Sequence, residues 1–273
     1  MKIENSAVLI TGASSGIGEA TALALASRRT RLALGARRVD RLAAIAERCR
    51  ALGSPQVVVN KLDVTSRGEV QEFVQAAIDG LGQIDVLINN AGRGWKGKLA
   101  EMPVEEAEAL IATNLMGTLW CTQAALPSML AARSGVIINV ASVVGFRAMP
   151  YSALYSASKH AVLGMSHALR GELKGSGIKI SVVCPGITDT EFFQGIPPEG
   201  PLVNSADHVA KAIVRAIRWP RRDVIIAPYR LVHLLEPVWG GLLDGVMANF
   251  RRRTYPHLTR IEEVKLDSQD NPR

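Results

Sequence analysis

The sequence predicts an α/β fold in which about seven parallel strands form a doubly wound sheet with helices on both faces. Short, almost continuously apolar segments alternate with longer amphipathic segments up to about residue 227. Hydrophobic residues make up 48% of the 273 residues, which is enough for a large buried core. No linker or repeat interrupts the pattern. We therefore expect one domain over residues 1–228, with residues 229–273 as a helical extension of the same domain.

The strand-like segments are apolar along their whole length, as expected for parallel strands buried on both faces. They are Ala7–Ile10, Arg31–Gly35, Gln56–Lys61, Ile84–Asn89, Gly135–Ala141, Lys179–Val183 and Asp223–Ala227. Amphipathic stretches between them predict the helices of right-handed crossovers. Among these stretches are Gly18–Arg29, Arg38–Leu52, Ser66–Leu81, Val104–Ala132 and Ser156–Lys174.

A glycine-rich turn, Thr11-Gly-Ala-Ser-Ser-Gly-Ile-Gly18, joins the first predicted strand to the first predicted helix. Glycine lets the backbone turn tightly and approach a pyrophosphate, and the helix that follows offers free N–H groups and a partial positive charge. The spacing differs from the more familiar G-x-G-x-x-G dinucleotide pattern. A plain strand-to-helix turn is the alternative, but the elements on either side favour cofactor binding.

Two arginines follow the second predicted strand, where dinucleotide-binding folds contact the adenosine ribose. An acidic residue there would accept hydrogen bonds from the 2′-hydroxyl of NAD, whereas this chain has Ala36, Arg37 and Arg38. Ala36 leaves room, and arginines suit a 2′-phosphate through bidentate hydrogen bonds. The pattern predicts NADP(H) rather than NAD(H). The alternative is that both arginines only solvate the start of the next helix, which also holds Asp40.

Tyr155 and Lys159 are four residues apart, so they share one face of a predicted helix and can point into the same pocket. A nearby ammonium stabilises phenolate, and we expect Lys159 to lower the pKa of Tyr155. The phenol would then serve as a general acid or base near neutral pH. Such a pair also occurs by chance on solvated helices, so its weight comes from the nucleotide turn earlier in the chain.

Together these motifs resemble the short-chain dehydrogenase/reductase family, whose members have a single-domain Rossmann fold, and the resemblance covers about residues 5–227. It implies a catalytic tetrad formed by Asn114, Ser142, Tyr155 and Lys159. The cofactor-binding residues that it implies, together with those named above, are Gly12, Ser14, Ser15, Gly16, Ile17, Gly18, Arg37, Arg38, Asp63, Val64, Asn89, Ala91, Gly92, Tyr155, Lys159, Pro185, Gly186, Ile187 and Thr190. Asn90 receives a structural role from the resemblance.

The resemblance implies reversible hydride transfer between a nicotinamide and a carbonyl carbon. Tyr155 would donate a proton to the developing alkoxide, and Ser142 would hydrogen-bond to the same oxygen. Lys159 would also hold the nicotinamide ribose, and Asn114 would hold a water that relays protons to Lys159. This chemistry needs no metal. The rival hypothesis is a dinucleotide-binding regulator or sensor without catalysis, and the intact tetrad argues against it.

A segment rich in glycine and proline, Gly186–Asn204, is predicted to form a partly irregular flap over the site. Apolar side chains in this flap and after Ser142 would line a hydrophobic pocket. They are Phe192, Phe193, Ile196, Val143, Val144, Phe146 and Met149, with Trp95 as a further candidate. We expect a hydrophobic ketone or alcohol, such as a lipid-, steroid- or aromatic-like molecule, unless these side chains pack only within the protein.

Three cysteines without a CxxC pair, and no visible secretory signal or membrane span, predict a cytoplasmic protein. The net charge is +7, but its basic residues are dispersed, which disfavours nucleic acid as a partner. An apolar stripe within residues 229–253 would roof the pocket, pack in an oligomer or touch a membrane surface peripherally. By the resemblance we expect a homodimer or homotetramer formed through the predicted helices Val104–Ala132 and Ser156–Lys174.

Overall fold

The computed structural model describes residues 1–193 and 203–226, together with residues 245 and 249. Apart from those two positions, the predicted extension at 229–273 lies outside the described residues. Residues 194–202 of the predicted flap, including Ile196, also lie outside them. Within the described part of the chain, no helix is long and apolar enough to cross a membrane.

Seven parallel strands form the central sheet in the order β3-β2-β1-β4-β5-β6-β9. Their bounds are β1 (Ala7–Thr11), β2 (Arg31–Ala36), β3 (Val57–Lys61), β4 (Val86–Asn89), β5 (Gly135–Val140), β6 (Ile178–Cys184) and β9 (Asp223–Ile225). Strand β1 is central, because Val8 pairs with Leu32 of β2 on one side and with Val86 of β4 on the other. The strand order reverses between β1 and β4, and such a reversal opens a crevice at the carboxyl ends of the strands.

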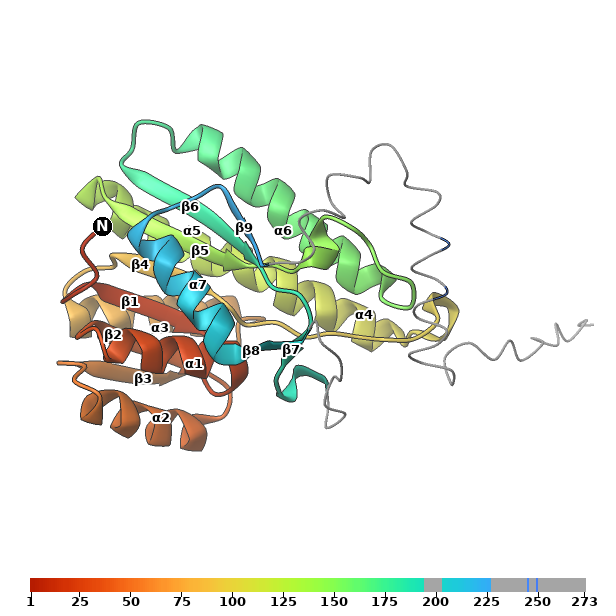
Figure 1. The fold of residues 1–273 in the computed structure, drawn as a ribbon. Helices are drawn as coiled ribbons and strands as arrows, with labels where there is room; N and C mark the ends of the chain where they lie inside the picture. The colour runs from red at the N-terminus through yellow and green to blue at the C-terminus, as the bar shows by residue number, and fades with distance from the viewer. Residues whose placement is uncertain (194–202, 227–244, 246–248, 250–273) are drawn as a thin grey trace, which may run out of the picture.

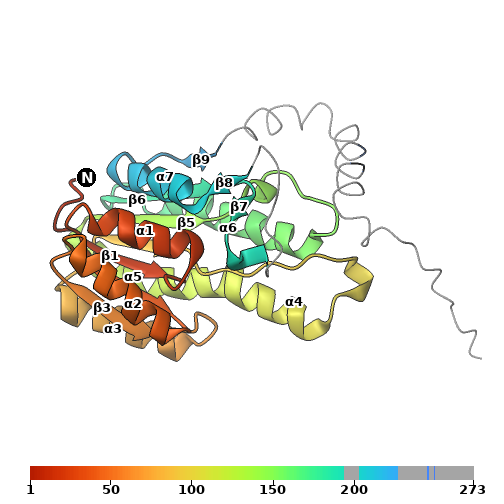
Figure 2. The same cartoon turned by 60° about the horizontal axis from the view of Figure 1, so that its bottom comes forward.

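Helices cover both faces of the sheet, as Figures 1 and 2 show. One face carries helices that share a large apolar cluster with the strands, namely α1 (Gly16–Ala26), α2 (Val39–Ala51) and α7 (Ala206–Arg218). The other face carries α3 (Arg67–Leu81) and α5 (Gly117–Ala132), which share a second cluster, and α6 (Ala153–Glu172), which packs over β6. A helix α4 (Val104–Ile111) leads into α5 through a π-helical turn at Ala112–Met116.

Local sequence signals fix several helix ends. The hydroxyl of Ser66 accepts a hydrogen bond from the backbone N–H of Glu69 and so caps α3. Gly82 ends the same helix with φ +82°, a left-handed conformation that favours glycine. Ser205 caps α7 in the same way, because its hydroxyl accepts from the N–H of His208 at 3.1 Å. These caps fix the lengths of helices that connect the strands.

The predicted fold class is confirmed, and every predicted strand is present with ends within about two residues of the prediction. The predicted single helix Val104–Ala132 is corrected, because the structure divides it into α4, the π-helical turn and α5. Helix α7 was not among the named predicted stretches. Two short parallel strands, β7 (Thr188–Asp189) and β8 (Asn204–Ser205), lie near the two ends of Gly186–Asn204, the segment predicted to be a partly irregular flap.

Candidate active site

The predicted site residues gather along the carboxyl edge of the sheet. The glycine turn follows β1, residues 90–93 follow β4, Ser142 follows β5 and Pro185 follows β6. Tyr155 and Lys159 enter from the first turns of α6. This edge is where parallel sheets with a reversal in strand order bind their ligands.

The glycine turn is shaped as a cradle for a phosphate. Gly12 has φ +65°, and a Cβ on it would lie 2.9 Å from Cα of Ala91. A Cβ on Gly18 would lie only 2.2 Å from the carbonyl oxygen of Gly12. No larger residue fits either position, and α1 begins inside the turn at Gly16, so its free N–H groups face the crevice. These positions fit a dinucleotide pyrophosphate.

Hydrogen bonds join the turn after β4 to the end of β1. The hydroxyl of Thr11 accepts from the backbone N–H groups of Asn90 and Ala91, each at 3.0 Å. The Asn90 amide donates to the carbonyls of Thr11 at 3.0 Å and Gly12 at 3.1 Å. Asn90 therefore has the structural role that the resemblance implied. The sequence argument missed Thr11, although a hydroxyl at the end of β1 is the available signal.

Asn89, for which cofactor binding is a prediction, has a side chain with partners in the interior. Its side chain is buried, and its amide donates to the hydroxyl of Thr122 at 3.0 Å and to Oδ1 of Asn139 at 2.8 Å. Those bonds join β4 to β5 and α5. The side chain of Asn89 therefore holds the sheet together, while Ala91 and Gly92 lie at the crevice.

Arginines surround the outer side of the glycine turn. Arg38 donates to the hydroxyl of Ser14 at 3.3 Å and to that of Ser15 at 2.6 Å. Arg37 is exposed and, within the described residues, makes no hydrogen bond. Arg41, which the sequence argument did not single out, forms a salt bridge with the carboxylate of Glu191, and so does Arg38. The predicted arginine pair is thus a larger cationic group at the start of α2.

Asp63, which is predicted to contact the adenine, follows β3. Burial acts to raise the pKa of its carboxyl, but hydrogen bonds from the backbone and hydroxyl of Thr65, with the charge of Arg37, bring the pKa below its ordinary value. The two Thr65 bonds measure 2.9 and 2.7 Å. Val64 packs against Gly117, where an added Cβ would lie 2.7 Å from its side chain. Ile17 packs on the core beneath α1.

The structure brings the Tyr155 phenol and the Ser142 hydroxyl together. Burial raises the pKa of Tyr155 to about 12, although a hydrogen bond with Ser142 acts to lower it. Ser142 is itself held in place, because its hydroxyl donates to the Pro185 carbonyl at 3.4 Å and accepts from the N–H of Val144 at 3.3 Å. At neutral pH the phenol is therefore protonated and points at a fixed hydroxyl.

Lys159 lies beside this pair but does not have the predicted effect on it. Its buried ammonium donates to the carbonyl oxygen of Val140 at 3.1 Å and lies 5.8 Å from the centre of the Tyr155 ring. The expected lowering of the Tyr155 pKa is corrected, because the desolvation of the phenol outweighs its polar surroundings. Burial also lowers the pKa of Lys159 to about 8.

Asn114 lies in the π-helical turn between α4 and α5, where its side chain is buried. Its amide oxygen accepts from the N–H of Arg93 at 2.8 Å, and its Nδ2 donates to the Arg93 carbonyl at 2.9 Å. Nδ2 also donates to the hydroxyl of Ser158 at 3.0 Å. A Cβ on Gly92 would lie 3.4 Å from the Asn114 oxygen and 3.6 Å from the Lys159 ammonium. Asn114 therefore ties the turn after β4 to α6 next to Lys159.

The segment after β6 covers the crevice from the far side. Pro185, Gly186 and Ile187 lead into β7, and the Ile187 carbonyl accepts from Asn204 of β8 at 2.8 Å. The Thr190 side chain contacts the glycine turn, because a Cβ on Gly16 would lie 3.0 Å from its methyl group. This segment therefore lies over the nucleotide turn as well as beside Ser142.

The predicted apolar lining is divided between the site and the core. The Phe192 ring lies 5.7 Å from the Tyr155 ring, centre to centre, and faces the site. Phe146 packs instead against the core cluster under α6, and Trp95 packs against Gly97. Val143, Val144 and Met149 are half-buried. The side chains of Phe193 and Ile196 lie outside those described.

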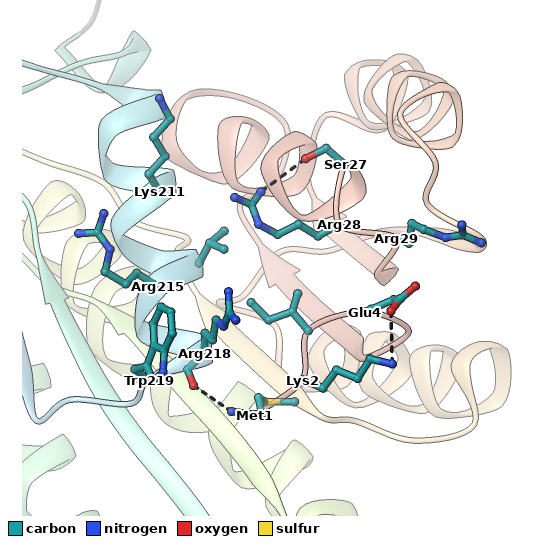
Figure 3. Close-up of a pocket in the computed structure, with 12 residues that line it drawn as sticks. Met1, Lys2, Glu4, Ser27, Arg28, Arg29, Lys211, Arg215, Arg218 and Trp219 are labelled. Atoms are coloured by element: carbon teal, nitrogen blue, oxygen red, sulfur yellow. Dashed lines mark hydrogen bonds and ion pairs between the residues drawn. The ribbon is translucent and has the colours of Figure 1, made fainter.

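A basic hollow of about 690 Å³ lies away from all these residues, at the amino edge of the sheet (Figure 3). Six of its lining residues are lysine or arginine, namely Lys2, Arg28, Arg29, Lys211, Arg215 and Arg218. Helices α1 and α7 both end at this hollow, and cations are favourable at the negative end of a helix dipole. The charge there is explained without a ligand, so we do not assign the hollow as the active site.

A family model described as short chain dehydrogenase matches residues 6–200. The chain belongs to the short-chain dehydrogenase/reductase family. An uncharacterized oxidoreductase from Staphylococcus epidermidis strain RP62A is 36% identical to this short-chain dehydrogenase over 219 residues, which cover 80% of this chain and 94% of the relative. An uncharacterized oxidoreductase from Staphylococcus saprophyticus is 40% identical over 190 residues, which cover 70% of this chain and 81% of the relative.

Solved structures with the same fold carry dinucleotides. An alcohol dehydrogenase from the archaeon Thermococcus sibiricus, complexed with 5-hydroxy-NADP, superposes with a TM-score of 0.75 and 32% identity over 81% of this chain and 95% of that chain. A short-chain dehydrogenase/reductase from Burkholderia phymatum, in complex with NAD, gives a TM-score of 0.82 and 28% identity over 89% and 97%. The protein is thus an oxidoreductase of a family that uses NAD or NADP.

Proposed function

We propose that this short-chain dehydrogenase is an NADP(H)-dependent oxidoreductase that interconverts a ketone or aldehyde and an alcohol on a hydrophobic substrate. The observation that carries the proposal is the position of the Tyr155 phenol. It is hydrogen-bonded with Ser142, and the centre of its ring lies 5.8 Å from the Lys159 ammonium. A phenol, a hydroxyl and an ammonium at one point are the groups that protonate and stabilise a developing oxygen anion.

Each of these side chains has a part in the reductive direction. Tyr155 donates its proton to the carbonyl oxygen as this becomes an alkoxide, and burial keeps the phenol protonated until that moment. Ser142 is held by its backbone partners, so its hydroxyl is positioned to donate to the same oxygen. When bound, the nicotinamide supplies the hydride for the carbonyl carbon. Lys159 stabilises the negative charge that stays on Tyr155 after the proton has left.

The arginines support NADP(H) over NAD(H). Arg38 directly precedes α2 and Arg41 lies in its first turn, where the positive end of the helix dipole disfavours cations. An anion at this place removes that cost, and the guanidinium groups suit a phosphate dianion. Arg37 makes no hydrogen bond within the described residues and is exposed, so its guanidinium is available to the same anion.

An apolar substrate is supported by the ring of Phe192. Phe192 is 38% exposed, and its ring lies 5.7 Å from the Tyr155 ring at an angle of 53°, so an apolar side chain borders the reacting group. Half-buried Val143, Val144 and Met149 follow Ser142 on the other side. Lipid-, steroid- and aromatic-like carbonyl compounds match these surroundings better than sugars, which need more hydrogen-bonding groups.

The proposal extends to the assembly of the protein and its place in the cell. A homodimer or homotetramer built on α4, α5 and α6 is supported by apolar side chains that these helices expose, such as Val104 at 67% and Leu130 at 44%. A cytoplasmic enzyme agrees with three buried free cysteines, Cys49, Cys121 and Cys184. A peripheral membrane contact through residues 229–253 is the lesser alternative.

The test is oxidation of NADPH by the purified protein across carbonyl compounds from sugars to steroids and acyl ketones, with Tyr155→Phe as the control. We expect turnover on apolar compounds that is lost in Tyr155→Phe while NADPH binding is kept. Full activity in the variant would refute the catalytic role of Tyr155. Tight NADPH binding without turnover on any compound would favour the rival proposal of a dinucleotide sensor.

A further inference from the structure

Glu191 occupies a position over the nucleotide turn that no sequence motif indicated. It opens the short turn η4 (Glu191–Phe193) and bridges two arginines from a distant part of the chain. Its Oε2 accepts a hydrogen bond from Arg38 at 2.8 Å, and its Oε1 accepts one from Arg41 at 2.5 Å. Each oxygen of the carboxylate thus serves one arginine, as two oxygens of a phosphate would.

The bridge is part of a larger contact between the segment after β7 and the nucleotide turn. Arg38 donates to the hydroxyls of Ser14 and Ser15 while it also holds Glu191. The neighbouring Thr190 packs its methyl group against Gly16. The carboxylate therefore lies beside the glycine turn that fits the pyrophosphate, and not on an unrelated part of the surface.

The position of the two arginines explains why an anion is bound there. Arg38 is the residue that precedes α2, and Arg41 lies in its first turn, so both face the positive end of the helix dipole. Mutual repulsion of the two cations adds to this cost. Glu191 supplies a compensating negative charge, and the two arginine hydrogen bonds hold the pKa of its carboxyl below the ordinary value. The carboxylate is ionised throughout the neutral range.

We propose that Glu191 determines cofactor selectivity by competing with the cofactor 2′-phosphate for Arg38 and Arg41. The inference rests on the proposed NADP(H) function and names the residue that limits it. A carboxylate and a phosphate use the same arginine donors and repel each other, so a 2′-phosphate has to displace Glu191. A cofactor with a free 2′-hydroxyl leaves the bridge intact. Glu191 therefore weakens binding of NADP(H) and leaves binding of NAD(H) almost unchanged.

The experiment compares dissociation constants of NADPH and NADH, by fluorescence titration, for the wild type, Glu191→Gln and Asp189→Asn. Asp189 is exposed and lies two residues from Glu191. Asp189→Asn removes one negative charge, as Glu191→Gln does, so it is the matched control. Because exposed ion pairs are individually weak, we expect Glu191→Gln to tighten NADPH about three- to tenfold and to leave NADH within about twofold. Asp189→Asn should leave the ratio of the two constants near the wild-type value. The dissociation constant of adenosine 2′-phosphate should change in Glu191→Gln as that of NADPH does, since this compound carries the same phosphate without the nicotinamide.

Different outcomes would overturn different parts of the inference. If the wild type prefers NADPH and Glu191→Gln does not raise that preference, the competition is refuted while the NADP(H) proposal stands. Equal tightening in Asp189→Asn would show that only net charge matters, and weaker binding of both cofactors in Glu191→Gln would show that the bridge only positions the turn. Either result refutes the competition. If NADPH binds no tighter than NADH in every variant, the arginine site of the proposed function fails as well.

Discussion

The two edges of the sheet carry similar charges in opposite electrostatic settings. At the amino edge, Arg215 and Arg218 lie in the last turn of α7, where the helix dipole favours cations. At the carboxyl edge, Arg38 and Arg41 lie at the start of α2, where the dipole disfavours them. The amino edge also has a hollow with about 690 Å³ of open space. Positive charge alone therefore does not distinguish the two edges.

The difference shows which charges need a ligand. Cations at the amino edge are stabilised by the fold itself, whereas those at the carboxyl edge need an anion from elsewhere. Glu191 supplies one in this structure. The same edge buries Lys159, another cation placed at a cost. Unfavourable charges thus mark the functional edge, and each variant below tests one side of this contrast.

The largest expected effect comes from the same substitution made at both edges. Ser142→Ala removes the hydroxyl that faces Tyr155 and should lower kcat about 10²-fold, a typical loss for one donor to an oxyanion. Ser6 is a buried serine at the amino edge, and its hydroxyl donates to the Ile3 carbonyl at 2.6 Å. Ser6→Ala should cost about 1 kcal/mol of stability and leave kcat unchanged. Steady-state rates and urea unfolding measure both, and an unchanged kcat in Ser142→Ala would contradict its role.

A pair of arginine substitutions tests the cofactor side of the contrast. Arg38→Gln should weaken NADPH by about ten- to a hundredfold, since charge-assisted hydrogen bonds contribute about 1.5–3 kcal/mol each, and should leave NADH within about twofold. Arg218→Gln, at the other edge, should change neither dissociation constant. Titration of both cofactors gives the answer. Equal losses for NADPH and NADH in Arg38→Gln would mean that Arg38 only supports the glycine turn through Ser14 and Ser15.

The cost of burying Lys159 predicts a pH dependence of stability. Its pKa is about 8 in the folded protein against the ordinary 10.5, so between these values the unfolded chain binds more protons. Lys159 should therefore contribute a gain in stability as the pH rises through this window, by about 2 kcal/mol between about pH 8 and about pH 9.5. The three buried cysteines, whose pKa values burial raises above 9.0, act with the opposite sign in the wild type and in the variant alike. Urea unfolding at several pH values should show the Lys159 contribution as a difference, with Lys159→Met losing about 2 kcal/mol relative to the wild type between these two pH values.

A lysine at the amino edge provides the comparison for this experiment. Lys211 is exposed on α7, and Lys211→Met should keep the pH dependence of stability that the wild type has. The raised pKa of Tyr155, about 12, acts with the opposite sign above about pH 10, and because Tyr155 and the cysteines are present in every variant, their effects cancel in the comparison. A curve for Lys159→Met that parallels the wild type would show that Lys159 is not buried as a charge.

The smallest expected effect concerns the helix dipoles themselves. Arg215→Gln removes a cation from the last turn of α7 and should lower stability by about 0.3–1 kcal/mol. Arg37→Gln removes one just before α2 and should leave stability unchanged or slightly raised, because the dipole acts against it. Both are exposed, so packing is little disturbed. Losses of equal size in thermal unfolding would remove the electrostatic distinction between the edges.

Most of the fold could be predicted because buried parallel strands leave a clear apolar signal. β1 and β2 were placed to within one residue, since every position in β1 is buried. The π-helical turn at Ala112–Met116 could not be predicted, because it adds a residue to a helix without changing the apolar pattern around it. It exists where the Asn114 side chain bonds both backbone groups of Arg93, a contact between distant residues.

Site residues that belong to one short motif could be predicted from the sequence. Site residues whose partners lie in a distant segment could not. The glycine turn and the pair Tyr155 and Lys159 were predicted from spacing, and Ser142 from the family resemblance, and the structure brings all of them to one edge. Glu191 was missed, because its partners Arg38 and Arg41 lie 153 and 150 residues away. The direction of the Tyr155 pKa was wrong, because sequence shows the neighbouring lysine but not the desolvation of the phenol. The motif that contains Asn89 could be recognised in the sequence, but the interior partners of its side chain, Thr122 and Asn139, could not.

The central claim is that the arginines at the carboxyl edge select a cofactor with a 2′-phosphate for the oxidoreductase. The most direct test is titration of the wild-type protein with NADPH and with NADH at one ionic strength. We predict a dissociation constant for NADPH at least about tenfold lower than that for NADH, since at least one charge-assisted hydrogen bond separates them. Equal constants, or tighter binding of NADH, would contradict the claim.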